Sequence, residues 1–378
     1  MEIESWYCNN FETGLKGRYV TLEMIMPLLE KYRDKFELSV SGLSENGKDI
    51  PQIKIGSGKK IILAWSQMHG NESTTTKALF DLMKFLDQEN LFQNEIQRFL
   101  RTYSLYVIPM LNPDGAGLYT RENANKVDLN RDAQDLSQSE SRILRTIFNK
   151  LKPDLCLNLH DQRTIYGFDD GLPATVSFLS PAANEVRSLT KARKRAMEDI
   201  VKMNQYLQKM IPGQVGRYDD SFNSACVGDA FQMAGATTIL FEAGHYRNDY
   251  HREKTREYIF YSLLALFDII GEKKVINYRS YFNIPENRKN YRDVIIRNAK
   301  LKQSDNPIDV AIHYSEVLKD EKITFEPIID QMDELEGLYG HVEVDLKGSE
   351  TLTNTDKNLT VGVKVLEYKD IWNIISLF

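Results

Sequence analysis

The sequence is poor in cysteine and has no long apolar run. Its three cysteines, Cys8, Cys156 and Cys226, are too few for a disulfide framework and too scattered for a zinc ribbon, which favours a reducing compartment. No apolar run approaches the roughly 20 residues of a membrane-spanning helix. The first residues, MEIESWYCNNFETGLKGRY, lack the basic start and apolar core of a signal peptide. We therefore expect a cytoplasmic protein without a membrane partner, although removal of an export signal is compatible with the same sequence.

The chain also lacks an excess of basic residues. Its 378 residues include 48 Lys and Arg against 54 Asp and Glu, a formal net charge of −6, so no nucleic-acid partner is expected. Hydrophobic residues make up 42% and charged residues 27%, which is typical of a globular protein. The length fits two to three domains, or one large domain with an appendage.

Strand patterns and helix patterns alternate along most of the chain. The predicted strands cover 59–65, 103–111, 154–159 and 237–242, and the predicted helices cover 20–34, 72–86, 139–151, 185–210 and 253–271. Apolar strands that alternate with helices predict the α/β class, with a mixed, largely parallel central sheet flanked by helices. We assign this pattern to a catalytic domain over residues 1–275.

The pattern changes after residue 275. Three stretches there have strand character and are separated by polar turns: ITFEPIIDQ, HVEVDLKG and LTVGVKVLEYK. Residues 276–378 are therefore predicted to form a small, β-rich C-terminal appendage. Its role is open: it could cover the mouth of an active site, form a dimer contact or stabilise the core. The oligomeric state is equally open.

Polar side chains occur where the four predicted strands end. His69, Asn112, His160 and Glu242 each lie at or just beyond such an end. Ligands of open α/β sheets bind outside the carboxyl ends of the strands, so these side chains are expected at one edge. Two imidazoles and a carboxylate are the donors of a catalytic zinc site. A lone His-x-x-Glu, such as His69 to Glu72, is common without a metal, so the prediction depends on the strand ends together.

Six short motifs occur in the order found in the zinc carboxypeptidases, the relatives of carboxypeptidase A. They are HGNE at 69–72, NPDG at 112–115, TRENANKVDLNRD at 120–132, SQSES at 137–141, LH at 159–160 and FEAG at 241–244. On these motifs the chain resembles that family over about residues 15–270. The resemblance implies a zinc carboxypeptidase-like fold and one Zn²⁺ per chain.

The resemblance also implies roles for the residues at the strand ends. His69, Glu72 and His160 match the zinc ligands, and Glu242 matches the general base that activates the zinc-bound water. Zinc lowers the pKa of bound water to about 7, and a carboxylate beside it can carry the proton to the leaving amine.

The TRENANKVDLNRD motif supplies four more matches. Arg121 matches the arginine that polarises the scissile carbonyl, and Asn130 and Arg131 match the pair that holds the free carboxylate of the substrate. Asp128 matches an acid that orients the first histidine. A guanidinium suits both tasks because it forms bidentate, charge-assisted hydrogen bonds. Taken singly, each arginine could equally be a solvated loop charge, and Asp128 a plain turn acid.

Three positions depart from the family pattern. Tyr218 is the nearest match to a substrate-contacting tyrosine, and a surface tyrosine is an equal alternative. Gly228 falls where a charge would select basic residues, so a preference for C-terminal Lys or Arg is not supported. Asp132 stands where the family more often has asparagine, and it could weaken binding of an anionic terminus or recruit an amino group.

Three functions remain in competition. The leading one is a zinc-dependent hydrolase that removes the C-terminal residue of a peptide, or of an amino-acid conjugate with a free carboxylate. The second is an amidase or deacylase of the same structural family, acting on muropeptides or N-acyl amino acids. The third is a binding module on an inactive scaffold, which is disfavoured because every ligand and the base are present.

Overall fold

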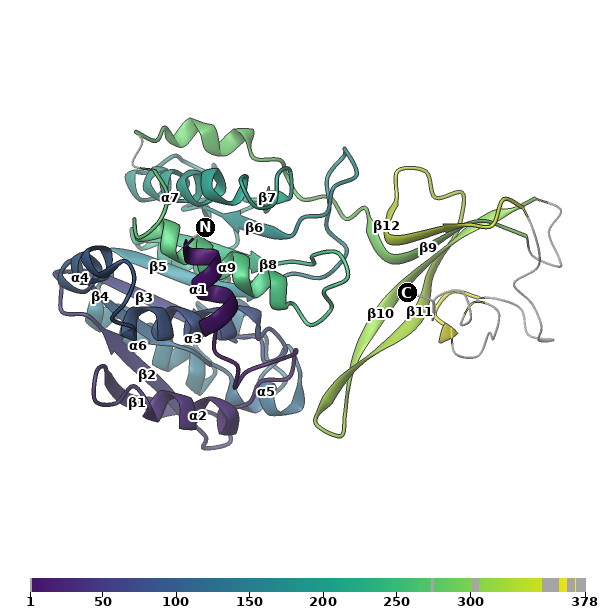
Figure 1. The fold of residues 1–378 in the computed structure, drawn as a ribbon. Coiled ribbons are helices and arrows are strands. Elements are labelled where there is room, and N and C mark those ends of the chain that lie inside the picture. The colour runs from purple at the N-terminus through teal and green to yellow at the C-terminus, as the bar shows by residue number, and fades with distance from the viewer. Residues whose placement is uncertain (1, 273–274, 301–305, 349–359, 366–370, 372–378) are drawn as a thin grey trace. The chain divides into compact units, whose positions relative to one another are not determined.

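The computed structural model describes residues 2–272, 275–300, 306–348, 360–365 and 371. The chain divides into two compact units (Figure 1). The first unit contains Met1–Gln162 and Thr175–Glu286, and the second contains Arg163–Ala174 and Asn287–Phe378. The first unit thus continues past the predicted boundary at residue 275, and the second takes in an internal segment. A separate functional role for residues 276–378 stays a prediction.

The first unit is built on a sheet of eight strands in the order β1-β2-β4-β3-β5-β8-β6-β7. The strands are β1 (Glu37–Leu43), β2 (Asp49–Ile55), β3 (Lys60–Ser66), β4 (Tyr103–Ile108), β5 (Leu155–Asp161), β6 (Val176–Leu179), β7 (Val215–Arg217) and β8 (Thr237–Ala243). The central neighbours β4, β3, β5 and β8 are parallel, whereas β1–β2, β2–β4 and β6–β8 are antiparallel. This mixed, largely parallel sheet confirms the predicted fold class.

Helices cover both faces of this sheet because the buried strands are apolar on both sides. The helical elements are α1 (Glu2–Asn10), α2 (Leu22–Glu30), α3 (Thr74–Asp87), α4 (Gln93–Thr102), α5 (Pro113–Leu118), η1 (Leu129–Arg131), α6 (Ser139–Leu151), α7 (Lys191–Leu207), α8 (Val227–Met233), α9 (Glu253–Leu266) and η2 (Tyr278–Asn283). Ile62 and Ala64 of β3 belong to the core shared with α3, α7 and α9. Leu63 and Trp65 point to the other face, into the core shared with α6 and α8.

A buried charge network joins α3 to α9. Arg256 of α9 donates Nε–H and Nη2–H hydrogen bonds to the two carboxylate oxygens of Asp81, both at 2.6 Å, and both side chains are fully buried. Lys77, one turn earlier on α3, donates to Glu253 Oε1 at 2.7 Å. The bidentate pairing of Arg256 with Asp81 is the kind of contact that allows opposite charges to be buried together.

The second unit contains a sheet of four strands in the order β11-β10-β9-β12. The strands are β9 (Tyr291–Ala299), β10 (Ile308–Lys319), β11 (Lys322–Asp333) and β12 (Tyr339–Asp345). The predicted β-rich C-terminal region is therefore confirmed. Of the predicted strand LTVGVKVLEYK at 359–369, only residues 360–365 are described, and there Lys364 forms an isolated bridge with Ile328. Among the described helices, none is long and apolar enough to cross a bilayer.

The internal segment Arg163–Ala174 leaves the sheet of the first unit directly after β5. It pairs with the start of the C-terminal region, since Gly167 and Arg288 exchange two backbone hydrogen bonds of 3.0 and 2.9 Å. Tyr291 N–H also donates to the carbonyl of Ile165 at 3.1 Å. The second unit is therefore assembled from two stretches that are far apart in sequence.

Candidate active site

The carboxyl ends of β5 and β8 place two polar side chains next to each other. His160 and Glu242 are direct partners in the parallel register of these strands. Their neighbours Leu159 and Phe241 belong to the core on the α3, α7 and α9 side. Because side chains alternate along a strand, His160 and Glu242 both point to the opposite face.

The turn between β3 and α3 carries the other two predicted ligands. Glu72 N–H donates to the carbonyl of His69 at 3.1 Å, which closes the turn immediately before α3 begins at Thr74. The predicted helix started at residue 72, so the structure moves Glu72 out of the helix and into the turn. Proximity to the positive end of the α3 dipole favours a carboxylate there.

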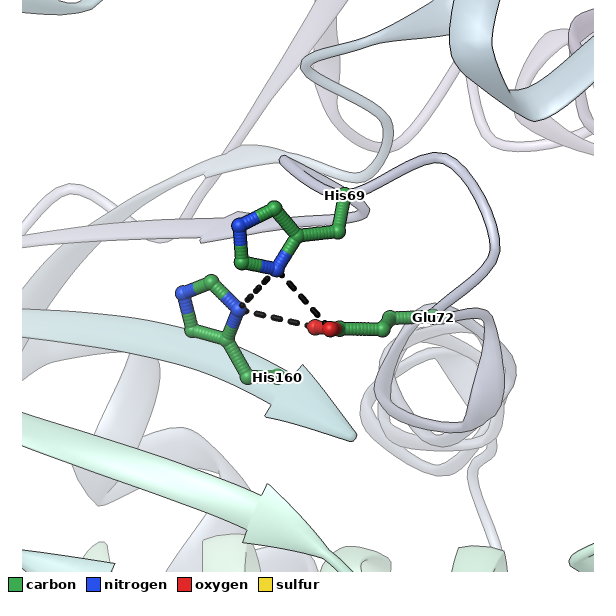
Figure 2. Close-up of side chains that lie close together, drawn as sticks. All are labelled: His69, Glu72 and His160. Carbon is green, nitrogen blue, oxygen red and sulfur yellow. Dashed lines mark hydrogen bonds and ion pairs between the residues drawn. The ribbon is translucent and has the colours of Figure 1, made fainter. Parts of the chain in front are cut away.

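His69, Glu72 and His160 converge on one point (Figure 2). Glu72 Oε1 lies 2.8 Å from His69 Nδ1, Glu72 Oε2 lies 2.8 Å from His160 Nδ1, and the two Nδ1 atoms are 3.1 Å apart. One ligand atom from each residue lies within 4.8 Å of the others. Across the part of the chain that the structure describes, this is the one group of three or more such side chains able to hold a metal ion.

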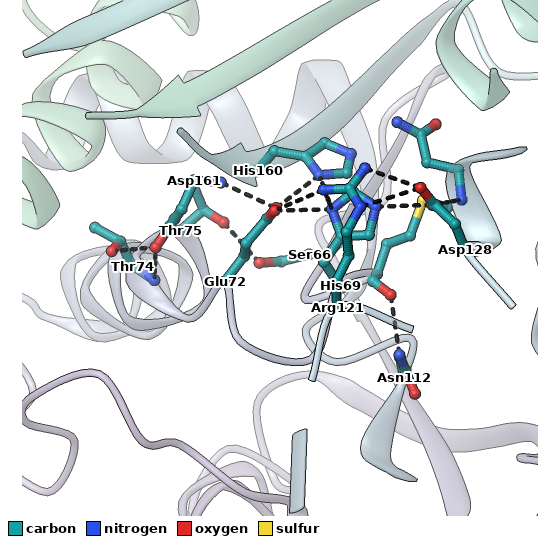
Figure 3. Close-up of polar contacts among 12 residues, drawn as sticks. Ser66, His69, Glu72, Thr74, Thr75, Asn112, Arg121, Asp128, His160 and Asp161 are labelled. Atoms are coloured by element: carbon teal, nitrogen blue, oxygen red, sulfur yellow. Dashed lines mark hydrogen bonds and ion pairs between the residues drawn. The ribbon is translucent and has the colours of Figure 1, made fainter. Parts of the chain in front are cut away.

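The hydrogen bonds around the cluster are better explained by a bound metal ion than by hydrogen bonds among the three side chains. His69 Nε2 lies 3.0 Å from Asp128 Oδ1, which fixes the proton on Nε2 and leaves the lone pair of Nδ1 facing His160 (Figure 3). Two imidazole nitrogens that face each other beside a carboxylate are the donor set of a His₂Glu zinc site. Asp128 therefore lies within hydrogen-bond distance of His69, and its role in orienting this histidine stays a prediction.

The surroundings keep the two acids of the cluster ionised. Burial alone would raise the pKa of Glu72, but His69 and His160 outweigh it and hold that pKa well below its ordinary value. Burial likewise opposes ionisation of Asp128, whose pKa is nevertheless held low by His69 and then by Arg121. Glu72 Oε2 also accepts the backbone N–H of Asp161 at 3.1 Å. Negative oxygen is thus fixed where a cation would bind.

Arg121 reaches the same cluster from the loop after α5. Its Nη1 lies 3.2 Å from His69 Nδ1 and 3.5 Å from Glu72 Oε1, while its Nε–H and Nη2–H donate to Asp128 Oδ2 at 3.1 and 2.9 Å. Its side chain is 41% exposed, so the guanidinium faces both the ligands and solvent. This is a position from which it can meet a molecule bound at the ligands.

Glu242 is an acid of the site whose pKa is raised. Burial, then the charges of Glu72 and Asp161, raise the pKa of Glu242 well above its ordinary value, and Arg121 and Arg252 oppose this in part. An acid with a raised pKa beside a ligand cluster is suited to taking up and releasing a proton.

The LNRD stretch packs against the start of α8. Asn130 Oδ1 accepts the backbone N–H of Val227 at 3.1 Å, and Arg131 is exposed, with Nη1–H donating to the carbonyl of Asn130 at 2.8 Å. Asp132 is buried and accepts hydrogen bonds from the backbone of Ser137 and Gln138, at 2.9 and 3.0 Å. Asp132 therefore holds the loop before α6, which leaves its predicted influence on a bound terminus without structural support.

The two predicted pocket residues lie on different elements, after β7 and in α8. Tyr218 follows β7, with its N–H bonded to the carbonyl of Phe178 at 3.0 Å. Gly228 lies buried in α8, where an added Cβ would lie 3.2 Å from Pro181 Cγ and 3.7 Å from Asn158 Nδ2. Contact of Tyr218 and Gly228 with a substrate stays a prediction.

The sequence reasoning missed Asn158. This residue points to the same face of β5 as His160, is 2% exposed, and its Oδ1 has no hydrogen-bond partner among the described residues. A signal existed, because an asparagine inside the buried strand LCLNLHD is unusual unless its amide is used.

Comparison with known proteins identifies this arrangement. The family model for zinc carboxypeptidase matches residues 21–225, more than half of the chain. The chain belongs to the zinc carboxypeptidase family. Its His69-Glu72-His160 cluster is the metal site typical of a zinc enzyme of this family. The match ends before Glu242, so the position of Glu242 is known from the structure rather than from the family model.

The curated carboxypeptidase relatives are distant and are matched only in part. Carboxypeptidase 2 of Trichophyton rubrum is 25% identical over 164 residues, 40% of this chain and 30% of the relative. Mouse carboxypeptidase Z is 31% identical over 125 residues, 28% of this chain and 19% of the relative. The chain thus spans less than a third of the length of these curated relatives.

Solved structures of metallo-carboxypeptidases share the fold. A metallo-carboxypeptidase from Burkholderia cenocepacia has a TM-score of 0.54 at 16% identity, covering 66% of this chain and 69% of that chain. A metallo-carboxypeptidase from Pseudomonas aeruginosa, in complex with (2-guanidinoethylmercapto)succinic acid, has a TM-score of 0.51 at 19% identity, covering 66% and 70%.

Proposed function

We propose that this protein is a zinc-dependent exopeptidase that removes the C-terminal residue of a peptide. The observation that carries the proposal is the convergence of His69, Glu72 and His160, with Glu242 beside His160 in the register of neighbouring strands. One Zn²⁺ per chain suits the two nitrogens and one carboxylate better than Mg²⁺ or Ca²⁺, which prefer oxygen ligands.

Each residue has one task in this proposal. When bound, zinc supplies a Lewis acid that lowers the pKa of a coordinated water. Glu242 would accept a proton from the attacking water and deliver it to the leaving amine. Arg121 donates hydrogen bonds to the carbonyl oxygen of the scissile bond as negative charge develops there. Asp128 keeps His69 in the tautomer that binds metal and anchors Arg121.

The substrate is expected to carry a free carboxylate. Asn130 and Arg131 are proposed to bind it, since the exposed guanidinium of Arg131 offers a fork of donors. Gly228 brings no charge, so cleavage of C-terminal Lys or Arg is not expected to be preferred. The cytoplasmic location expected from the scarce cysteines stays a prediction.

A hydrolysis screen by mass spectrometry tests the proposal. Zinc-loaded protein and the E242Q variant would be offered peptides with varied C-terminal residues, muropeptides and N-acyl amino acids. Loss of single C-terminal residues with the wild type alone would support the exopeptidase. Cleavage of only muropeptides or acyl amino acids would replace it with the amidase or deacylase alternative, and no cleavage of any substrate would contradict both.

A further inference from the structure

Asn112 joins two loops of the site without reaching the metal ligands itself. It is fully buried at the N-cap of α5, where its Oδ1 accepts the N–H of Gly115 at 2.8 Å. Its Nδ2 donates to the carbonyls of Met68 and Glu122, both at 3.2 Å. Met68 immediately precedes His69, and Glu122 immediately follows Arg121, so one amide spans the ligand turn and the arginine loop.

This set of partners fixes the amide in one orientation. Two of the partners are carbonyl oxygens and the third is an N–H, so an exchange of the amide oxygen and nitrogen would break all three hydrogen bonds. The backbone of Asn112 is also fixed, because its N–H donates to the carbonyl of Gln67 at 3.1 Å. Asn112 therefore has no freedom to adjust if one loop moves.

Two glycines allow the three segments to meet. A Cβ on Gly115 would lie 2.5 Å from Asn112 Nδ2 and 2.5 Å from the carbonyl oxygen of Glu122. A Cβ on Gly70 would lie 2.0 Å from the carbonyl carbon of Gly115. Since real side chains do not approach so closely, the contact needs glycine at both positions. The ligand turn, α5 and the arginine loop are thus packed backbone against backbone.

We propose that Asn112 is a positioning residue that holds Arg121 at its distance from His69 and Glu72. The partly exposed guanidinium of Arg121 is anchored by Asp128, but the backbone from which it extends is anchored on α5. Thr120 N–H donates to the carbonyl of Gly115 at 2.9 Å, and the N–H of Gly115 is capped by Asn112. Asn112 is therefore bonded to Glu122, directly after Arg121, and to Gly115, which accepts the N–H of Thr120 directly before Arg121; Thr120 Oγ1 also donates to the carbonyl of Glu122 at 3.0 Å.

The inference rests on the proposed function, because Arg121 matters only if it meets a reacting carbonyl. Asn112→Asp is the appropriate variant: it keeps the size of the side chain and the acceptor for Gly115, and it removes both donated hydrogen bonds. Misplacement of a catalytic group by about 1 Å can cost about 100-fold in rate. We expect N112D to lower kcat by about 10- to 100-fold with a smaller effect on KM.

A double-mutant cycle with R121A separates positioning from a general structural role. In the R121A background N112D should lower kcat/KM by less than about threefold, because the group that it positions is already absent. An equal loss in both backgrounds would overturn the inference. So would a loss of zinc affinity, measured by chelator competition, that matches the loss of activity.

The same experiment distinguishes failure of the proposed exopeptidase function from failure of the proposed role of Asn112. If zinc-loaded wild type hydrolyses none of the substrates, the exopeptidase proposal fails first. If wild type is active and N112D matches it in kcat, only the role of Asn112 fails. Should N112D fold poorly, Asn112→Ser with the same R121A cycle provides the test, because the shorter hydroxyl cannot span both carbonyls.

Discussion

At the scale of single residues, the neighbouring side chains His160 and Glu242 have similar surroundings but different proposed roles. His160 and Glu242 face the same side at paired positions, yet only His160 joins the cluster of ligand atoms. Burial lowers the pKa of His160, which keeps its imidazole neutral and able to bind metal. Burial raises the pKa of Glu242, which prepares it to hold a proton.

The first prediction uses this difference. His160→Ala should lose zinc affinity by more than the 10- to 100-fold that is typical for residues outside the ligand set, because it removes a ligand. Glu242→Gln should keep zinc affinity close to wild type and lose about 100- to 10,000-fold in turnover, because it removes only the proton carrier. Zinc content by mass spectrometry, chelator competition and kcat measure both effects. Normal turnover of E242Q would contradict the assignment of the base.

Residue types and their order were sufficient to predict the cluster of His69, Glu72 and His160. They were not sufficient for Asp132, whose role depends on where its carboxylate points. Asp132 accepts hydrogen bonds from Ser137 and Gln138 in its own loop, so its carboxylate oxygens already have partners within that loop. The side-chain oxygen of Asn158, which has no hydrogen-bond partner among the described residues, became visible only once the strand around it was known to be buried.

At the scale of elements, long helices with a clear apolar period were predicted best. The predicted helix at 139–151 matches α6 at both ends. The helices α1 and α4 were not predicted, nor were the short strands β6 and β7. The helix α1 buries Ile3, Trp6 and Tyr7, and Trp6 stacks on Phe260 of α9. Tertiary packing therefore stabilises α1, and its local sequence gives little sign of it.

The second prediction concerns the contact between α3 and α9. Arg256→Met should leave the Asp81 carboxylate buried without its cation and lower the free energy of unfolding by about 3–5 kcal/mol. The control is Arg33→Met, since Arg33 and Glu30 form an exposed pair whose loss should leave the free energy of unfolding nearly unchanged. Urea denaturation measures both. Equal costs for the two variants would show that the buried pair adds no special stability.

At the scale of the whole molecule, alternation of strands and helices was sufficient to predict the fold class. The membership of Arg163–Ala174 in the second unit could not be predicted, because its partners are more than a hundred residues later in the chain. No local pattern encodes such a pairing. The order of the strands in the first sheet could not be predicted from the sequence for the same reason.

The third prediction concerns the pH dependence of stability. Burial lowers the pKa of Lys77 to about 8, against the opposing charge of Glu253. In the folded state Lys77 therefore releases its proton near pH 8, whereas the unfolded chain keeps it to about pH 10.4. Between these values the unfolded state binds more protons, so this lysine makes the free energy of unfolding rise with pH.

Comparison with Lys77→Met isolates that contribution. The free energy of unfolding of wild type, relative to K77M, should increase between about pH 7.5 and about pH 9.5. Lys35→Met is the control, because its side chain is half-exposed and should leave the slope unchanged. Urea denaturation at the two pH values measures the differences. A relative stability that falls with pH would mean that the buried amine keeps its proton.

The pairing of the loop after β5 has a consequence for the synthesis of the protein and for the interpretation of truncated fragments. During translation the strand that carries His160 emerges long before Arg288 and Tyr291, which supply the hydrogen-bond partners of that loop. The loop therefore reaches its final pairing only when synthesis has passed Tyr291. A fragment that stops at Glu286 would keep every predicted ligand and leave this loop without its partner strand. Inactivity of such a fragment would thus report on an unfinished loop, and would not show that the C-terminal residues touch substrate.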